Sequence, residues 1–314
     1  MKMPFRFITE CSINILAALL CVGLIETSRA QVYVANYASG TIGEYTASGT
    51  MINSALISGL SGPFGIAVSG NFLFISQQGN GSIAQYTTSG TLVNSHLVTG
   101  LSQPAGIAIW GNDLFVANSS GPTSTTAVGE YTLSGATVNA SLISGFENPV
   151  GVATDGNNLY VSAFSGGTVG KYTMSGATVD DSLISGLPNP GGLVLNGSGD
   201  LFVSTYDHIG EFTTSGGIVN ASLISNGYNT GTGLALDAAG DLLWADNYGG
   251  AGGNKIGEYT ASGQTINTSF ITGLQNPVGI AVVPEPTIFG LVSCCLVIAI
   301  LPRRKLAGKK NSIC

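Results

Sequence analysis

The sequence predicts an all-β fold, a six-bladed β-propeller with four-stranded blades whose ring is closed by the innermost strand at the C-terminal end. Three observations lead to this prediction. Glycine is abundant, at 46 of 314 residues, and charged residues are scarce, at 9%, which is typical of many short strands joined by tight turns. A unit of about 40 residues recurs along residues 31–283. Each unit holds four strand-like segments, as a propeller blade does.

The first two strands of the unit are defined by small and apolar residues. The first strand opens on a glycine, at Gly65, Gly106, Gly151, Gly192, Gly233 and Gly279. The second strand follows a short turn and starts at Leu73, Leu114, Leu159, Leu201 and Leu242, with a further copy from Val32. Small residues in the first strand suit the crowded centre of a propeller, where the innermost strands converge.

The third and fourth strands are joined by a repeated Ser-Gly pair. The third strand ends on an aromatic residue, at Tyr45, Tyr86, Tyr131, Tyr172, Phe212 and Tyr259. The pair that follows each time, such as Ser48-Gly49, predicts a hairpin with a positive φ at the glycine. The fourth strand reads MINSALI after Gly49, and the other units carry variants of it.

The ends of the repeat region predict ring closure. The region begins with a second strand at Val32 and finishes with a lone first strand at Gly279. Pairing of these two strands completes one blade and leaves no exposed edge open to aggregation. A solenoid of stacked units is the structural alternative, but it leaves both terminal units incomplete.

The units resemble NHL repeats, in which a proline precedes a Gly-Ile-Ala-Val strand and a Leu-Tyr-Val-Ala-Asp strand follows. The proline is present at Pro63, Pro104, Pro149, Pro190 and Pro277, whereas the stretch before Gly233 reads YNTGTG. The aspartates that end these strands survive only in part, chiefly at Asp237 and Asp246. The resemblance implies a six-bladed propeller. In this family that fold carries calcium-dependent lactonases, streptogramin lyases, peptidyl-hydroxyglycine lyases and binding modules, and fold alone selects none of them.

The N-terminal segment predicts export. Residues 1–30 carry Lys2 and Arg6, then an apolar run and small residues at positions 28 and 30. We interpret them as a signal peptide cleaved after Ala30, with an uncleaved membrane anchor as the alternative. The propeller domain is then expected to span residues 31–283.

The C-terminal segment predicts sorting at a membrane. Residues 284–305 contain Pro284-Glu285-Pro286, a short apolar span and the cluster Arg303-Arg304-Lys305, and residues 306–314 form a short tail that the cations would hold in the cytoplasm. This order resembles the PEP-CTERM sorting signal, although Cys294-Cys295 and the extension to Cys314 depart from it. An ordinary tail anchor is the alternative.

The sorting resemblance implies a partner and a route. The partner is an exosortase-type processing enzyme that recognises the tail and cleaves near the triplet. The protein would cross the inner membrane, stay anchored through its C-terminal segment until it is processed, and then reach the cell surface or the extracellular matrix.

The charge of the chain excludes one class of partner. Residues 31–286 hold two lysines and fifteen Asp or Glu, a net charge of −13. Such a body repels a nucleic-acid backbone, so we expect no nucleic-acid partner. The same span has no cysteine, which excludes a disulfide framework, a Cys-ligated metal and a Cys nucleophile there.

The residues that enter the innermost strands predict a central channel with no metal ligands and no catalytic residue. These residues are Phe64, Ala105, Val150, Gly191, Thr232 and Val278, which are apolar or small. A central metal needs oxygen ligands instead, so we expect no metal site, no catalytic residue and no resident cofactor. Glu44, Glu130, Glu211 and Glu258, repeated in the third strands, are expected to form a solvated outer row.

Two alternatives with chemistry stay open. His208 beside Asp207 would be the centre of a Ser-His-Asp site. The turns at Asp155, Asn196 and Asp237 would hold calcium, although we first interpret these residues as hydrogen-bonding their own backbone.

Aromatic residues in the loops of one face form the candidate ligand site. They are Tyr37, Phe64, Phe164, Tyr206, Tyr228 and Tyr248. Exposed rings among Asn and Ser suit a neutral glycan, and the alternative is that these rings pack under their own loops. The leading prediction is a non-catalytic surface or matrix protein that binds an extracellular polysaccharide or a surface protein. The alternative is a propeller enzyme of the lactonase or lyase type.

Overall fold

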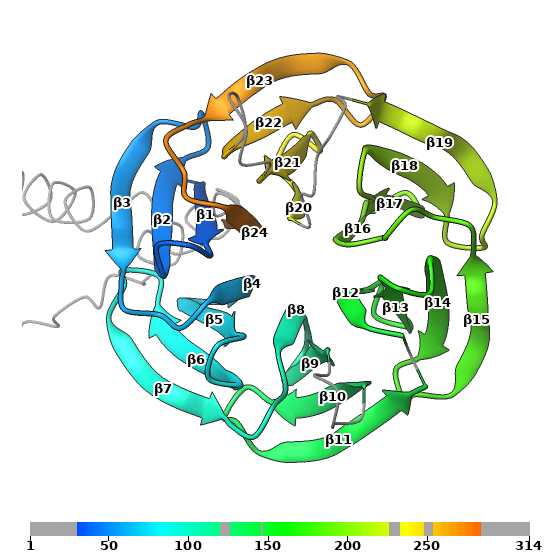
Figure 1. Cartoon of the computed structure of the whole chain (residues 1–314), viewed down its shortest axis with the longest axis horizontal. Helices are drawn as coiled ribbons and strands as arrows, with labels where there is room; N and C mark the ends of the chain where they lie inside the picture. Colours follow the sequence, from blue (N-terminus) through cyan, green and yellow to red (C-terminus); the bar gives the residue numbers. More distant parts are fainter. Residues whose placement is uncertain (1–29, 120–125, 146, 226–232, 248–253, 284–314) are drawn as a thin grey trace, which may run out of the picture. The chain divides into compact units, whose positions relative to one another are not determined.

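The structure is a computed structural model that describes residues 30–119, 126–145, 147–225, 233–247 and 254–283. Every regular element in these ranges is a β-strand, and the strands form six four-stranded sheets arranged around one axis (Figure 1). No helix in the described ranges is long and apolar enough to cross a membrane. The predicted six-bladed propeller is therefore confirmed.

The blades are numbered from the N-terminal side. Blade 1 holds β24 (Pro277–Val283), β1 (Gln31–Asn36), β2 (Thr41–Thr46) and β3 (Met51–Ile57), from the centre outwards. Blade 2 holds β4 (Pro63–Ser69), β5 (Phe72–Gln77), β6 (Ser82–Thr87) and β7 (Leu92–Val98). Blade 3 holds β8 (Pro104–Trp110), β9 (Asp113–Asn118), β10 (Ala127–Thr132) and β11 (Thr137–Ser144).

The remaining blades follow the same order. Blade 4 holds β12 (Pro149–Thr154), β13 (Asn158–Ala163), β14 (Thr168–Thr173) and β15 (Thr178–Ile184). Blade 5 holds β16 (Leu193–Leu195), β17 (Asp200–Ser204), β18 (His208–Thr213) and β19 (Ile218–Ser225). Blade 6 holds β20 (Leu234–Leu236), β21 (Leu242–Asp246), β22 (Lys255–Tyr259) and β23 (Thr265–Ile271).

Blade 1 closes the ring as the sequence predicts. The last strand, β24, pairs antiparallel with the first, β1, and Gln31 lies opposite Val283. The innermost strand of this blade therefore comes from the opposite end of the propeller domain. Since β24 ends at Val283, the closing strand reaches the residue before Pro284.

The glycines of the Ser-Gly hairpins have the predicted positive φ, and each also lies in close contact with a backbone carbonyl of the preceding blade. Their φ values run from 75° at Gly49 to 88° at Gly135. A Cβ added at Gly135 would overlap the carbonyl oxygen of Leu97 in the outer strand of blade 2, and one at Gly49 would overlap that of Phe270 in blade 6. The hairpin glycine thus both forms its turn and lets neighbouring blades approach.

The first-strand glycines bring the innermost strands together. A Cβ at Gly106 would overlap the carbonyl oxygen of Val150 in the next blade, and one at Gly279 would overlap that of Phe64. The requirement for small residues at the centre, inferred from the repeat, therefore has a direct physical cause.

The core of the propeller lies between its blades. The largest fully buried side chains include Tyr33, Phe74, Phe115, Tyr160 and Phe202, all on second strands. Hydrophobic clusters join residues of adjacent blades, such as Phe115 and Val161 across the interface of blades 3 and 4. Each blade is thus stabilised mainly by its two neighbours.

The glutamate row is not the solvated row that the sequence suggested. Glu44 is only 7% exposed and accepts a hydrogen bond of 2.5 Å from the amide of Gln31, and Glu130, Glu211 and Glu258 are half-buried. The expectation fails because third strands lie inside the sheet, where side chains face the neighbouring blade. Burial raises the pKa of all four carboxyl groups.

Candidate functional site

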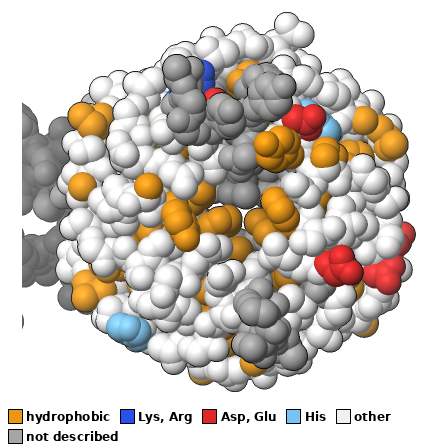
Figure 2. Space-filling view, viewed as in Figure 1, with side chains coloured by type: hydrophobic (Ala, Val, Ile, Leu, Met, Phe, Trp, Pro, Cys, Tyr) orange, Lys and Arg blue, Asp and Glu red, His pale blue; other side chains and the backbone are white. Residues whose placement is uncertain are grey.

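The propeller has two faces of different construction. The loop face carries the connections from second to third strands and from each outer strand to the next blade. The hairpin face carries the turns between first and second strands and the Ser-Gly hairpins. In Figure 2, which looks along the axis as Figure 1 does, hydrophobic side chains gather near the centre and charged side chains are sparse.

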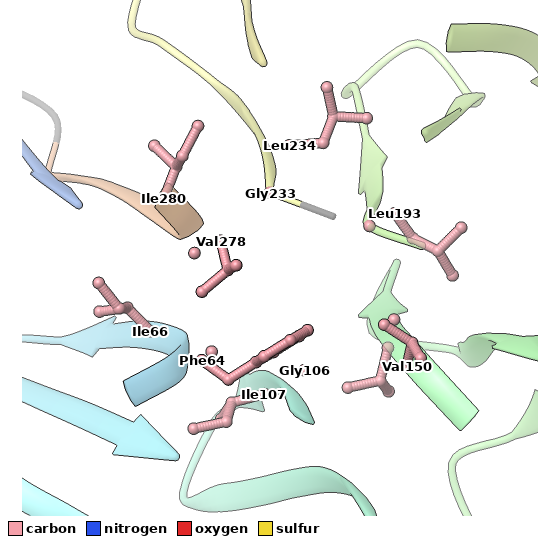
Figure 3. A pocket seen from close by; sticks show the side chains of 15 residues that line it. Phe64, Ile66, Gly106, Ile107, Val150, Leu193, Gly233, Leu234, Val278 and Ile280 are labelled. Carbon is pink, nitrogen blue, oxygen red and sulfur yellow. The ribbon is translucent and has the colours of Figure 1, made fainter. Parts of the chain in front are cut away.

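The channel along the axis has a cavity of about 110 Å³ lined by glycine and apolar side chains. Phe64, Val150 and Val278 line it as predicted, and their side chains point into the central space (Figure 3). Ala105 is fully buried, Gly192 lines the cavity where we expected Gly191, and Thr232 lies outside the described residues. The described lining offers no carboxylate or imidazole to a metal or a substrate.

The loops around the channel mouth share a backbone conformation that the sequence analysis missed. The residue before the first-strand proline has a positive φ in five blades, at Gly62, Gln103, Asn148, Asn189 and Asn276. Its carbonyl can accept from the residue after the second strand, as Asn276 does from the backbone N–H of Tyr37 at 3.0 Å. A polar side chain ending the second strand also fixes this loop, as when Asn36 Oδ1 accepts from the N–H of Gln275. The Asn-Pro dipeptides were the available signal for this geometry.

The predicted rim aromatics fall into three groups. Tyr37 and Tyr206 are exposed, at 37% and 41%. Phe64 and Phe164 are partly buried and pack against the interblade core of blades 3 and 4, and Phe64 also lines the channel. Tyr228 and Tyr248 lie outside the described residues.

The His208–Asp207 pair forms, but Ser222, which lines the same pocket, is bonded elsewhere. His208 Nδ1 lies 2.6 Å from Asp207 Oδ1. Both His208 and Ser222 line a pocket of about 460 Å³ between blades 4 and 5. The hydroxyl of Ser222 is 2.6 Å from that of Ser225, so these serines pair with each other.

The Asp and Asn turns bond their own backbone, as their first interpretation held. Asp155 Oδ1 accepts from the N–H groups of Asn157 and Asn158, at 2.8 and 2.7 Å. Burial by itself would raise the Asp155 pKa, but hydrogen bonds from Asn157, Asn158 and Tyr160 together lower it. Within the described residues no group of three or more His, Cys, Asp or Glu is placed to hold a metal ion.

Two exposed aromatic side chains, Trp110 and Phe72, escaped the sequence analysis, and Trp110 is the more exposed. Trp110 ends the first strand of blade 3 on the hairpin face and is 51% exposed. The other tryptophan, Trp244, is 1% exposed. The signal available in the sequence was the mismatch with the repeat, because blade 2 has Ser69 at the matching position, opposite Phe72 as Trp110 is opposite Asp113.

The sorting residues cannot be placed. Pro284, Glu285, Pro286, Arg303, Arg304 and Lys305 lie outside the described residues, as do residues 1–29. The signal peptide, the apolar span and the basic cluster therefore stay predictions from the sequence.

Comparison with known proteins establishes the fold. No protein-family model matches the sequence, and no curated protein matches it. The chain is similar to a chain of the nidogen–laminin complex, with 17% identity, a TM-score of 0.66, and coverage of 81% of this chain and 98% of that one. It is also similar to virginiamycin B lyase from Staphylococcus aureus, with 19% identity, a TM-score of 0.54 and coverage of 80% and 78%.

A gluconolactonase from Xanthomonas campestris is similar as well, with 15% identity, a TM-score of 0.58 and coverage of 68% of this chain and 78% of that one. Identities this low show a shared fold alone. The chain is a six-bladed β-propeller whose structural neighbours include two enzymes and a chain from a protein complex.

Proposed function

We propose that this protein is a non-catalytic binding module, exported and held at the cell surface, whose loop face binds a neutral extracellular polysaccharide. The observation that carries the proposal is the contrast between the channel and the rim. The described channel lining is glycine and apolar side chains, while Tyr37 and Tyr206 are exposed on the loop face, Tyr206 beside the exposed Asp207.

The rim suits a sugar ligand for physical reasons. A tyrosine ring offers an apolar face to the C–H groups of a pyranose and a hydroxyl to its oxygens. The loops that carry the rings are fixed by backbone bonds such as Tyr206 N–H to the carbonyl of Pro188, at 3.0 Å. Less conformational entropy is then lost on binding. The net negative charge of the body favours a neutral polysaccharide over an anionic one.

The predicted export and sorting segments add a cellular location to the proposal. The signal peptide would export the chain, and an exosortase-type enzyme would process it near Pro284-Glu285-Pro286. The closing strand ends at Val283, so a cut at the triplet would leave almost no linker on the propeller.

A glycan array on the purified propeller tests the binding. Residues 31–283 close into their own ring through β24, so they can be produced without the flanking segments. We expect binding to neutral polysaccharides and at least roughly tenfold weaker binding in a Tyr37→Ala/Tyr206→Ala double variant. The control is Phe72→Asn on the hairpin face. Blade 4 has an asparagine, Asn158, at the position that matches Phe72. Unchanged binding by the double variant would contradict a loop-face site.

The second candidate is an enzyme of the lactonase or lyase type. The likeness to virginiamycin B lyase and to a gluconolactonase is what favours it. Incubation of the propeller with calcium and gluconolactone separates the candidates. Stoichiometric calcium binding with turnover of the lactone would overturn the binding-module proposal.

A further inference from the structure

Trp110 lies in a pocket on the hairpin face, away from the loop-face site proposed above. The pocket has a volume of about 320 Å³ and is formed by the turns of blades 3, 4 and 5. We call it the Trp110 pocket. Its lining includes Trp110, Asp155, Asn196, Thr214 and the turn glycines Gly197 and Gly199. This volume falls at the lower end of the range for small-ligand sites.

The indole ring is held in place by a glycine of the next blade. Gly156 in the β12–β13 turn has a φ of +86°, and a Cβ added there would overlap the indole of Trp110. The ring therefore rests against bare backbone, while about half of the side chain stays open to solvent. An aromatic side chain that is fixed and still exposed loses little entropy when a ligand stacks on it.

Two polar side chains beside the indole are also fixed. Asp155 accepts a 3.0 Å hydrogen bond from the Tyr160 hydroxyl besides those from its own turn. Asn196 Oδ1 accepts from the N–H groups of Ser198 and Asp200, and its Nδ2 donates to Asp200 Oδ2 at 2.7 Å. Because an amide nitrogen has two hydrogens, Asn196 keeps a second donor for a ligand.

These groups define the chemistry of the ligand. The aromatic face suits the C–H side of a pyranose, and the second amide hydrogen of Asn196 suits a hydroxyl oxygen of the sugar. Among the described residues, those that line the pocket include the Asp155 carboxylate and no lysine or arginine, and the nearby Lys171 ammonium is bonded to the Thr214 carbonyl. This charge distribution disfavours an anionic sugar. We propose that the Trp110 pocket is a saccharide site that binds a neutral pyranose unit.

The proposal goes beyond the loop-face function and does not depend on it. If both sites bind sugar, one propeller presents a site on each face, and it can bridge two polysaccharide strands. If only the Trp110 pocket binds, the protein attaches to polysaccharide through its hairpin face.

Tryptophan fluorescence reads this site directly. Trp244 is buried, so solvent-sensitive emission comes from Trp110. The propeller is titrated with neutral hexasaccharides of glucose, mannose, galactose and N-acetylglucosamine, and with polygalacturonate as the anionic probe. We expect a blue shift with at least one neutral hexasaccharide and a weaker response to polygalacturonate. No shift with any neutral hexasaccharide would overturn the proposal.

Calorimetry on matched variants locates the binding. Trp110→Ser introduces the residue type that blade 2 has at the matching position, Ser69. It should weaken hexasaccharide binding roughly tenfold or more. Gly156→Ala keeps the tryptophan but displaces its ring, so it should weaken binding too, with circular dichroism to check folding. Phe72→Asn, on the same face but outside the pocket, should bind as the parent does.

The loop-face variant separates the two proposals. Tyr37→Ala/Tyr206→Ala should keep the Trp110 fluorescence shift, whatever happens to polysaccharide binding on the array. A Trp110→Ser protein that binds the hexasaccharide with unchanged affinity would overturn the assignment of this pocket.

Discussion

At the scale of single residues, the repeated glycines do most to fix this fold, and they act for two separable reasons. The hairpin glycines need a positive φ. They also lie so close to a carbonyl of the neighbouring blade that a Cβ would overlap it. Other turn glycines need only the first. Gly111 has a φ of +60° and no heavy atom within 4 Å of a built Cβ.

Gly135→Ala should therefore destabilise the propeller more than Gly111→Ala. We expect a loss of about 1 kcal/mol at Gly111 from the left-handed backbone alone. At Gly135 we expect roughly 3 kcal/mol, because blade 2 must also move away from the new methyl group. Denaturant unfolding with a common m-value measures both losses. Equal losses would show that the contact with Leu97 contributes nothing.

At the scale of strands, the blades are joined by side chains and their outer edges are protected by bulges. In each blade the outer strand departs from regular pairing, as where Glu44 pairs with Asn53 but Tyr45 with Met51. The Asn or Asp at the bulge accepts from the backbone N–H two residues on, as Asn53 does from Ala55 at 3.1 Å. Bulges of this kind hinder edge-to-edge pairing between propellers.

Buried serines join the inner strands of neighbouring blades. Ser162 Oγ accepts from the N–H of Gly151 at 2.7 Å within blade 4 and donates to the carbonyl of Gly191 at 2.6 Å, at the entry to blade 5. Ser76 makes the equivalent contacts with Gly65 and Ala105. Alanine occupies the matching position in other blades, as at Ala117.

Ser162→Ala should thus fit sterically and lose only the two hydrogen bonds. Leaving both buried partners unsatisfied should cost about 1–3 kcal/mol. Ser54→Ala, at an exposed position of β3, is the control and should stay within about 0.5 kcal/mol of the parent. Thermal and denaturant unfolding give the comparison. A Ser162→Ala protein as stable as the control would show that these bonds add nothing.

At the scale of the whole molecule, the closed ring combines a net negative charge with buried or half-buried glutamates in four blades. Burial raises their pKa values above the ordinary 4.5. The folded state consequently takes up protons before the unfolded state as the pH falls, so the free energy of unfolding rises with acidification. The gain stops below the ordinary carboxyl pKa. Asp155, whose pKa is lowered, works in the opposite direction and loses its contribution there.

The melting temperature should therefore rise as the pH is lowered from neutral toward the ordinary carboxyl pKa of 4.5. Glu44→Gln introduces the residue that blade 2 has at this position, Gln85. It should flatten the pH dependence and raise the melting temperature at neutral pH, because the buried site then holds no charge. Glu147→Gln, at an exposed position, is the control. A melting temperature that falls on mild acidification would contradict the prediction.

The sequence by itself determined the blade number, the strand order, the hairpins and the closing strand. It could do so because these features repeat: six copies of Gly-apolar strands and Ser-Gly turns fix register by periodicity, and the unpaired first and second strands at the two ends leave one way to complete the ring.

Only the tertiary structure decided which side chains are accessible. Periodicity shows which side chains share one face of a strand, but it does not show how closely the neighbouring blade covers that face. For this reason Glu44 was wrongly expected to be solvated. Loops have no periodicity, so the exposure of Tyr37 and Tyr206 and the partial burial of Phe164 could not be predicted from their neighbours in the chain. The Trp110 pocket needs turns from three blades that lie far apart in sequence. Such a site exists only after the blades have packed against one another.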